Sequence, residues 1–199
     1  MVKKQKLIGD IIRINAHIGG YNCPGEEWRS SKSISGGILY DMGAHILEYC
    51  FQLIDSPVTE VSGFTHTGFW ADQSKWKNDT NEDDANIVVR FKSGQWITMN
   101  CSSIDSYPGN KDRGWMEITG TKGTYIIDPG AWKLITKQEI KTGPELPGNW
   151  GDYYKNLANH LVNGEPLVIT AELGRKIIHI IDMGYQSAKK GRTLKPVHK

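Results

Sequence analysis

Alternation of apolar and polar positions predicts β-strands in the first fifth and in the middle of the chain. The first strand is expected from Ile8 to Ile18. It has an apolar side and a polar side, formed by Ile12, Ile14 and Ala16 and by Arg13, Asn15 and His17. Further strands are expected at 59–66, 86–91, 95–100, 115–119, 124–127 and 132–135. Short glycine-containing connections at 92–94 and 120–123 indicate hairpins, and hence one mostly antiparallel sheet of at least five strands.

Apolar residues at helical spacing predict three helices. The first covers 38–54 and ends before Pro57. The second covers 150–162 and ends at Asn163-Gly164, while the third follows a Thr170 cap and ends at Gly191. Because helices and hairpins occur in separate blocks, the pattern predicts an α+β fold, with a mostly antiparallel open sheet and helices packed on one face.

The other face of the sheet would then lack a cover. We expect it to carry side chains such as Trp96, Ile97 or Met99, depending on the register of that strand. An apolar sheet face in water is a liability, so we expect this face to mediate a homodimer or a higher assembly.

Length and charge narrow the class of protein. The 199 residues, 38% of them hydrophobic, fit a single domain over 1–199. No apolar run approaches the roughly 18 residues that a membrane span needs, which argues against a membrane protein. With 24 Lys plus Arg against 22 Asp plus Glu, the only dense basic cluster is Lys3, Lys4 and Lys6, so no nucleic-acid partner is expected.

The cysteines indicate the compartment. Cys23, Cys50 and Cys101 are an odd number and have no C-x-x-C spacing, which argues against a disulfide framework and against a zinc site. The apolar run after the basic N-terminus is too short for a signal-peptide core. We therefore expect a cytoplasmic protein.

Candidate chemistry concentrates at the first predicted helix. Asp41 and His45 are four residues apart, so their side chains would be neighbours on one helical face, where a carboxylate can orient an imidazole for proton transfer. Gly36-Gly37 and Gly43 would let a substrate or another backbone segment approach closely. On spacing alone, a solvated or structural pair remains the more ordinary explanation.

Other groups of residues suggest weaker alternatives. Asp41, His45 and Glu48 share a face and could ligate a metal, but no further committed ligand accompanies them. Asp79, Asn81 and Asp83 begin with the spacing of a calcium loop and then depart from it, which favours a solvated loop. His66, Trp70 and Trp76 could wall a carbohydrate pocket, although tryptophans in loops commonly pack against a sheet.

A resemblance to a known family favours the catalytic explanation of Asp41 and His45 over the structural one. The residues from Trp28 to His45 follow the pattern W-R-x(5)-S-G-G-x-L-x-D-x-G-x-H, which resembles the substrate-domain signature of the glucose-fructose oxidoreductase, inositol dehydrogenase and MocA family (Gfo/Idh/MocA). Blocks at 82–94, 118–123 and 187–194 are similar to later parts of the family pattern and occur in the same order. The resemblance covers essentially the whole chain.

The resemblance implies an NAD(P)-dependent oxidoreductase that acts on a sugar, a polyol or a related hydroxy or keto compound. This chain would be its C-terminal substrate-binding and oligomerisation domain, an open sheet like that of glyceraldehyde-3-phosphate dehydrogenase. By position, His45 would be the general acid/base and Asp41 would orient the substrate or His45. Trp28 and Arg29 would lie along the edge of the NAD or NADP cofactor. No metal is implied.

One half of the family pattern has no counterpart here. Neither the glycine fingerprint G-x-G-x-x-G nor an E-K-P lysine motif occurs in the 199 residues, and both belong to the N-terminal Rossmann domain of the family. We therefore expect this chain alone to be inactive and to lack a dinucleotide site. It would be a truncated piece, a split-gene product that works with a separate Rossmann-domain chain, or a stand-alone carbohydrate-binding or self-association module.

Overall fold

The centre of the molecule is one eight-stranded sheet. The computed structural model describes residues 6–105, 113–145 and 148–196. The strands are β1 (Ile11–Gly19), β2 (Val58–His66), β3 (Asp84–Phe91), β4 (Trp96–Ser102), β5 (Arg113–Gly120), β6 (Gly123–Asp128), β7 (Ala131–Thr136) and β8 (Ile140–Pro144). Their order is β2-β3-β4-β1-β5-β6-β7-β8, and only β1 and β4 pair in parallel among these strands. The expected antiparallel open sheet is confirmed.

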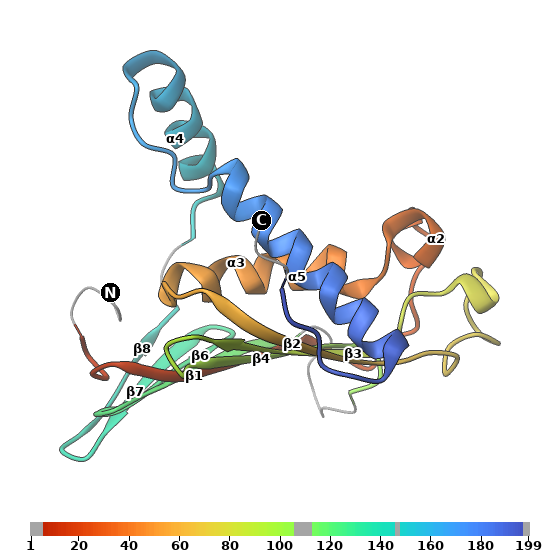
Figure 1. Cartoon of the computed structure of the whole chain (residues 1–199), viewed down its shortest axis with the longest axis horizontal. Helices are drawn as coiled ribbons and strands as arrows, with labels where there is room; N and C mark the ends of the chain where they lie inside the picture. Colours follow the sequence, from red (N-terminus) through yellow and green to blue (C-terminus); the bar gives the residue numbers. More distant parts are fainter. Residues whose placement is uncertain (1–5, 106–112, 146–147, 197–199) are drawn as a thin grey trace.

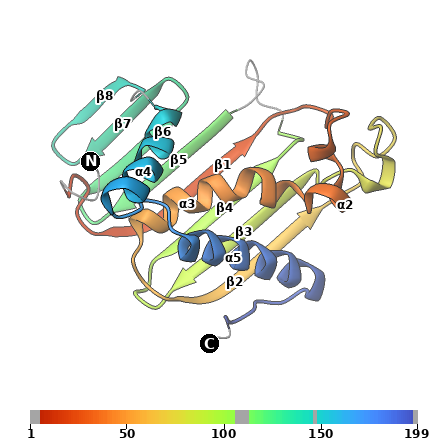
Figure 2. The same ribbon diagram turned by 90° about the horizontal axis from the view of Figure 1, so that it is seen from above.

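The helices of the described chain lie on one side of this sheet (Figure 1). They are α2 (Lys32–Ser35), α3 (Ala44–Leu53), α4 (Trp150–Asn163) and α5 (Ala171–Lys190). Seen from above, α5 crosses β2 and β3, and α3 lies beside it over β1 and β4 (Figure 2). This arrangement confirms the α+β prediction, with α2 as a short addition in a segment for which no helix was predicted.

The two C-terminal helices have similar ends and different surroundings. Thr170 caps α5 through a hydrogen bond from the Leu173 amide, as expected, and Gly164 and Gly191 end α4 and α5 in left-handed conformations. Helix α5 buries Ile177, Ile180 and Ile181. In contrast, α4 extends away from the sheet (Figure 1), and none of its residues with a described side chain is buried. Within the described ranges, no helix combines the length and the apolar content needed to cross a bilayer.

The hydrophobic core fills the space between the sheet and the helices. Its fully buried members include Ile14, Ile87, Val89, Ile97, Met99 and Ile181. Helix α5 approaches β2 so closely that a Cβ atom added at Gly63 would lie 2.0 Å from the backbone oxygen of Gly184. Two glycines therefore allow the helix to seat directly on the sheet.

The prediction for the uncovered face was only partly right. Ile97 and Met99 are fully buried on the helix side, because strand parity places Trp96, Thr98 and Asn100 on the open side. The centre of the open face is therefore polar. The apolar residues on which the homodimer prediction rested lie mostly in the core, and the homodimer itself stays a prediction.

Candidate functional site

The candidate site begins with a chain reversal in front of α3. Ser31 caps α2 by accepting a hydrogen bond from the Ile34 amide, and Gly36 ends α2 in a left-handed conformation. The next residues, Leu39–Gly43, form a single π-helical turn that continues directly into α3. Such turns widen the helix by one residue and often occur at functional sites.

The four predicted site residues lie at or near the surface of this segment. Trp28 is 56% exposed, and the Arg29 guanidinium lies 5.3 Å from the centre of its indole ring. Arg29 Nε lies 3.8 Å from Asp41 Oδ1 in the π-helical turn. His45 is exposed in the first turn of α3. The structure thus brings Trp28, Arg29 and Asp41 into contact. His45 lies about one helical turn after Asp41 and outside this group.

The expected direct contact between Asp41 and His45 is not formed. No hydrogen bond or ion pair links these two described side chains, and Asp41 is oriented by Arg29 instead. The physical reason is the π-helical turn, which changes the angular spacing that an α-helix would give to residues four apart. The metal alternative with Glu48 also lacks support, since the described residues contain no cluster of three His, Cys, Asp or Glu groups suited to a metal ion.

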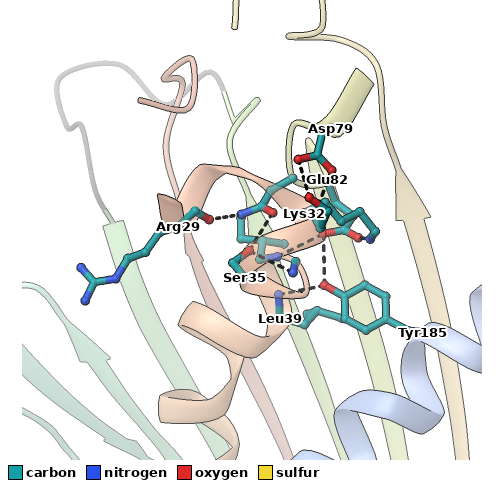
Figure 3. A network of polar contacts seen from close by, with 11 residues as sticks. Arg29, Lys32, Ser35, Leu39, Asp79, Glu82 and Tyr185 are labelled. Carbon is teal, nitrogen blue, oxygen red and sulfur yellow. Dashed lines mark hydrogen bonds and ion pairs between the residues drawn. The ribbon is translucent and has the colours of Figure 1, made fainter. Parts of the chain in front are cut away.

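A buried carboxylate holds the start of the site segment (Figure 3). Glu82 is completely buried and accepts hydrogen bonds of 3.1 Å from the Ile38 amide and from the Tyr185 hydroxyl. The same hydroxyl accepts a 3.1 Å hydrogen bond from the Leu39 amide. Lys32 forms an ion pair with the other oxygen of Glu82. These contacts satisfy amides at the start of the helical segment, which have no partner within it.

Glycines make these contacts possible. A Cβ atom at Gly37, whose φ is +120°, would lie 2.2 Å from the Tyr185 hydroxyl and 2.6 Å from Glu82. A Cβ atom at Gly43 would lie 2.9 Å from the end of the Met99 side chain in β4. The groups that approach these glycines closely therefore belong to this chain and not to a substrate. Their contacts hold the site segment against the sheet and α5.

Electrostatics around α2 follow from burial and hydrogen bonding. Burial lowers the pKa of the Lys32 ammonium, and the charge of Asp79 opposes that shift. Hydrogen bonds from Ser31 and Ser33 hold the pKa of the Asp79 carboxyl below its ordinary value. Burial raises the pKa of the Tyr185 hydroxyl, so this group stays protonated and donates a hydrogen bond to Glu82.

The acidic loop before β3 connects neighbouring segments through hydrogen bonds. Asn81 donates a hydrogen bond to the backbone oxygen of Arg29 and accepts one from Ser35. Asp83 accepts hydrogen bonds from the Phe69 and Trp70 amides, at 2.7 and 3.3 Å. The expectation of a solvated loop is wrong for Asn81 and Asp83, because both are buried and their oxygens accept hydrogen bonds from backbone amides or a side chain.

The aromatic stretch serves packing more than a pocket wall. Trp70 is only 4% exposed, and its indole N–H donates to Ser103. His66 contacts the carboxylate of Asp83 at 3.1 Å, and Trp76 is half-buried. Trp70 is therefore buried as expected, and it contacts Tyr21, Phe69 and Ser103, beyond the ends of β1, β2 and β4.

Only Trp28 and Arg29, among the predicted site residues, offer groups that suit contact with a dinucleotide. The 199 residues lack the glycine fingerprint that surrounds a pyrophosphate, whereas Trp28 and Arg29 present an exposed aromatic ring and an exposed guanidinium. These two groups could contact a dinucleotide that another domain holds. They do not form a cradle for it.

Sequence reasoning missed the residues that support the site. Glu82 and Tyr185 are 103 residues apart, and Lys32 belongs to a short helix that the sequence pattern did not predict. One signal was present, because three successive carboxylates at Glu82-Asp83-Asp84 directly precede an apolar strand. Acidic residues so close to a buried element need internal partners.

Comparisons with known proteins agree with the fold and the segment just described. The family model described as oxidoreductase family, C-terminal alpha/beta domain, matches residues 4–197. The scyllo-inositol 2-dehydrogenase (NADP(+)) IolW of Bacillus subtilis is 24% identical over an alignment of 230 residues, gaps included. The alignment covers 99% of this chain and 61% of that protein.

Solved structures show the same fold. The aldose-aldose oxidoreductase from Caulobacter crescentus matches with a TM-score of 0.79 and 20% identity, over 98% of this chain and 58% of that one. A levoglucosan dehydrogenase in complex with NADH and levoglucosan matches with a TM-score of 0.83 and 16% identity, over 100% and 62%. The chain thus spans less than two thirds of each relative. Because the family model matches nearly all of its length, this chain belongs to the Gfo/Idh/MocA oxidoreductase family, of which it is the C-terminal alpha/beta domain.

Proposed function

We propose that this chain is the substrate-binding and oligomerisation part of an NAD(P)-dependent oxidoreductase that acts on a sugar, a polyol or a related hydroxy or keto compound. His45 is the general acid/base, and Asp41 orients the substrate. Trp28 and Arg29 face the cofactor. The names of the relatives support this substrate class, since they include an inositol dehydrogenase, an aldose oxidoreductase and a levoglucosan dehydrogenase.

One observation carries the proposal. The segment from Trp28 to His45 is anchored on its inner side by the buried Glu82 and the partly buried Tyr185, while its own Asp41 and His45 stay accessible. Anchored elements hold reacting groups in place more precisely than free loops do. An exposed imidazole on an anchored support suits proton transfer to an external substrate.

The chain's own chemistry is a proton transfer. In the oxidation of a secondary alcohol, His45 accepts the hydroxyl proton while the carbon loses a hydride. When it is bound, the dinucleotide supplies the hydride acceptor. Asp41 accepts a hydrogen bond from a neighbouring hydroxyl, and Arg29 keeps the Asp41 carboxylate in place.

A binding experiment tests the substrate side with this chain alone. In NMR titrations of the ¹⁵N-labelled chain with scyllo-inositol and with levoglucosan, we expect the imidazole resonances of His45 to shift. The matched control is His179, another exposed histidine, on α5, which should not respond. Binding of NADH or NADPH by this chain alone should be weak in calorimetry.

An activity experiment tests the catalytic role. Fused to the Rossmann domain of a family member, the chain should reduce NAD(P)⁺ with a polyol, and His45→Ala should lower kcat by about 10²- to 10⁴-fold. The variant His179→Ala should retain activity. Ligand binding without turnover, indifferent to His45, would support the stand-alone binding module instead. Self-association and a cytoplasmic location stay predictions, which sedimentation and cell fractionation test.

A further inference from the structure

Helix α4 carries an apolar stripe that nothing in the described chain covers. Tyr153, Tyr154, Leu157 and Leu161 follow helical spacing, so they share one side of this helix. Tyr153, Tyr154 and Leu161 are 52%, 67% and 75% exposed. The helix extends away from the sheet (Figure 1), and no described residue of α4 belongs to the hydrophobic core.

The polar side of α4 is held by the loop that leads to α5. Asn156 donates a 3.0 Å hydrogen bond to the backbone oxygen of Pro166, and Asn159 donates one of 3.1 Å to the Glu165 carboxylate. Because a helix turns by about 100° per residue, Asn156 and Asn159 lie on the side of α4 away from Leu161. The loop therefore fixes the direction of α4 and leaves the apolar stripe free.

An isolated helix of this kind is only marginally stable. Helix α4 has 14 residues, a length at which helices without tertiary packing are marginal in water. It also contains Gly151, which weakens a helix further. Helices in proteins gain most of their stability from the packing of an apolar face. The stripe on α4 is therefore suited to contact with another folded unit.

The position of the candidate site indicates which unit that is. The helices that carry the Trp28 to His45 segment lie on the same side of the sheet as α4 (Figure 1). A domain that presents a dinucleotide to Trp28 and Arg29 lies on this side too. The 199 residues contain no dinucleotide fingerprint, and this chain covers only 62% of the levoglucosan dehydrogenase whose structure includes NADH.

We propose that the apolar stripe of α4 is the docking surface for the dinucleotide-binding domain, an inference that rests on the proposed function. Tyr153 and Tyr154 contact each other edge to face, with ring centroids 5.3 Å apart, and form an aromatic anchor of the kind that dominates many interfaces. Leu157 and Leu161 extend the apolar contact along the helix. Because the loop already orients α4, docking costs little conformational freedom.

The test compares amide hydrogen exchange in two proteins. One is this chain alone, and the other is this chain fused to the part of IolW that lies outside its alignment with this chain. The fusion keeps the local concentration of the docking partner high. We expect the amides of α4 to exchange at least about tenfold more slowly in the fusion, because docking protects the helix against local opening.

A pair of matched substitutions locates the contact. In the fusion, Leu161→Lys should return the exchange of α4 to the rate seen in the chain alone. Lysine favours helices about as well as leucine does, so the change reports a lost contact and not a weaker helix. The control is Phe64→Lys, which also replaces an exposed apolar residue, 63% exposed, but on the open face of the sheet beside Asn86. This variant should keep the protection of α4.

Three outcomes would overturn the docking surface. They are equal exchange of α4 in the chain and in the fusion, protection that survives Leu161→Lys, and protection in the chain alone that grows with its concentration. In the last case a second copy of this chain would cover the stripe.

The proposed function fails separately. His45→Ala should abolish turnover by the fusion and leave the protection of α4 intact. Protection of α4 without polyol oxidation would count against the proposed function and support the docking surface. Polyol oxidation by a fusion whose α4 stays unprotected would support the proposed function and overturn the docking surface.

Discussion

The two faces of the sheet differ most clearly along β4. On the helix side, Ile97 and Met99 are fully buried in the core, whereas on the open side Thr98 and Asn100 border a polar concavity. One strand therefore serves two purposes, because side chains alternate from face to face. The core lies on the helix side of the sheet, and the centre of the other face carries polar side chains. Substitutions should separate the two faces by their effect on stability.

The largest effect is expected where α5 touches β2. In Gly63→Ala the new methyl group would overlap the backbone oxygen of Gly184, and backbone cannot move aside as a side chain can. We expect a loss of about 3 kcal/mol in the free energy of unfolding, measured by urea denaturation.

The control is Gly174→Ala in α5, where an added Cβ meets no atom within 4 Å. It should stabilise the helix by about 0.5 kcal/mol. Equal effects of the two changes would contradict the described contact.

The next largest effect is expected at the buried carboxylate. Glu82→Ala removes the partner of Lys32, of the Tyr185 hydroxyl and of the Ile38 amide. Because the Lys32 side chain is 40% exposed and can be rehydrated, we expect a loss of about 2 kcal/mol, below the usual cost of breaking a fully buried pair.

A surface ion pair on β2 and β3 is the control for this change. Glu60 lies 3.0 Å from Arg90, and both side chains reach solvent. Glu60→Ala should cost less than about 0.5 kcal/mol in the same denaturation experiment. If Glu60→Ala and Glu82→Ala cost the same, the anchoring role of Glu82 would be wrong.

Adjacent valines in β3 give a direct comparison of the two faces. Val89 is completely buried on the helix side, and Val88 is half-buried on the open side. We expect Val89→Ala to cost about 2 kcal/mol and Val88→Ala less than about 1 kcal/mol, because the first leaves a cavity in the core and the second does not. A Val88→Ala cost as large as that of Val89→Ala would indicate that the open face is covered in solution.

Local pattern was enough to predict most of the strands and helices. Alternation in β3 and the caps at Thr170 and Gly191 are short-range signals, and the structure contains them as expected. In β1 the expected alternation holds for Ile14 and Ala16, whereas Ile12 is exposed, next to an irregularity in the pairing of β1 with β5. The strand β8 was missed because Ile140–Pro144 is a short edge strand with little alternation. The prediction for the open face was only partly right, because the sequence left the register of β4 open and a one-residue change of register exchanges Trp96 with Ile97.

The candidate site was less predictable than the fold. The segment from Trp28 to His45 was found through its motif, but the π-helical turn was not, since the apolar period fits an α-helix equally well. The contacts of Glu82 with Tyr185 join distant parts of the sequence, and those of His17 with Asp105 depend on how β1 pairs with its neighbours. Such contacts arise from tertiary packing and have no local signal.

The smallest effect concerns thiol chemistry and leaves stability unchanged. Cys101 of β4 points into the core and Cys50 of α3 is likewise buried, and burial raises the pKa of each thiol to about 12. At pH 9 fewer than about one in a thousand of these groups is ionised, and burial also blocks the reagent. Cys23 is exposed.

In the folded protein we expect one thiol to react rapidly with 5,5′-dithiobis(2-nitrobenzoic acid), and all three to react rapidly in urea. Cys23→Ser should remove the fast phase, and Cys101→Ser should leave it. A second fast thiol below pH 9 would show that the helix side of the sheet opens more readily than its packing implies.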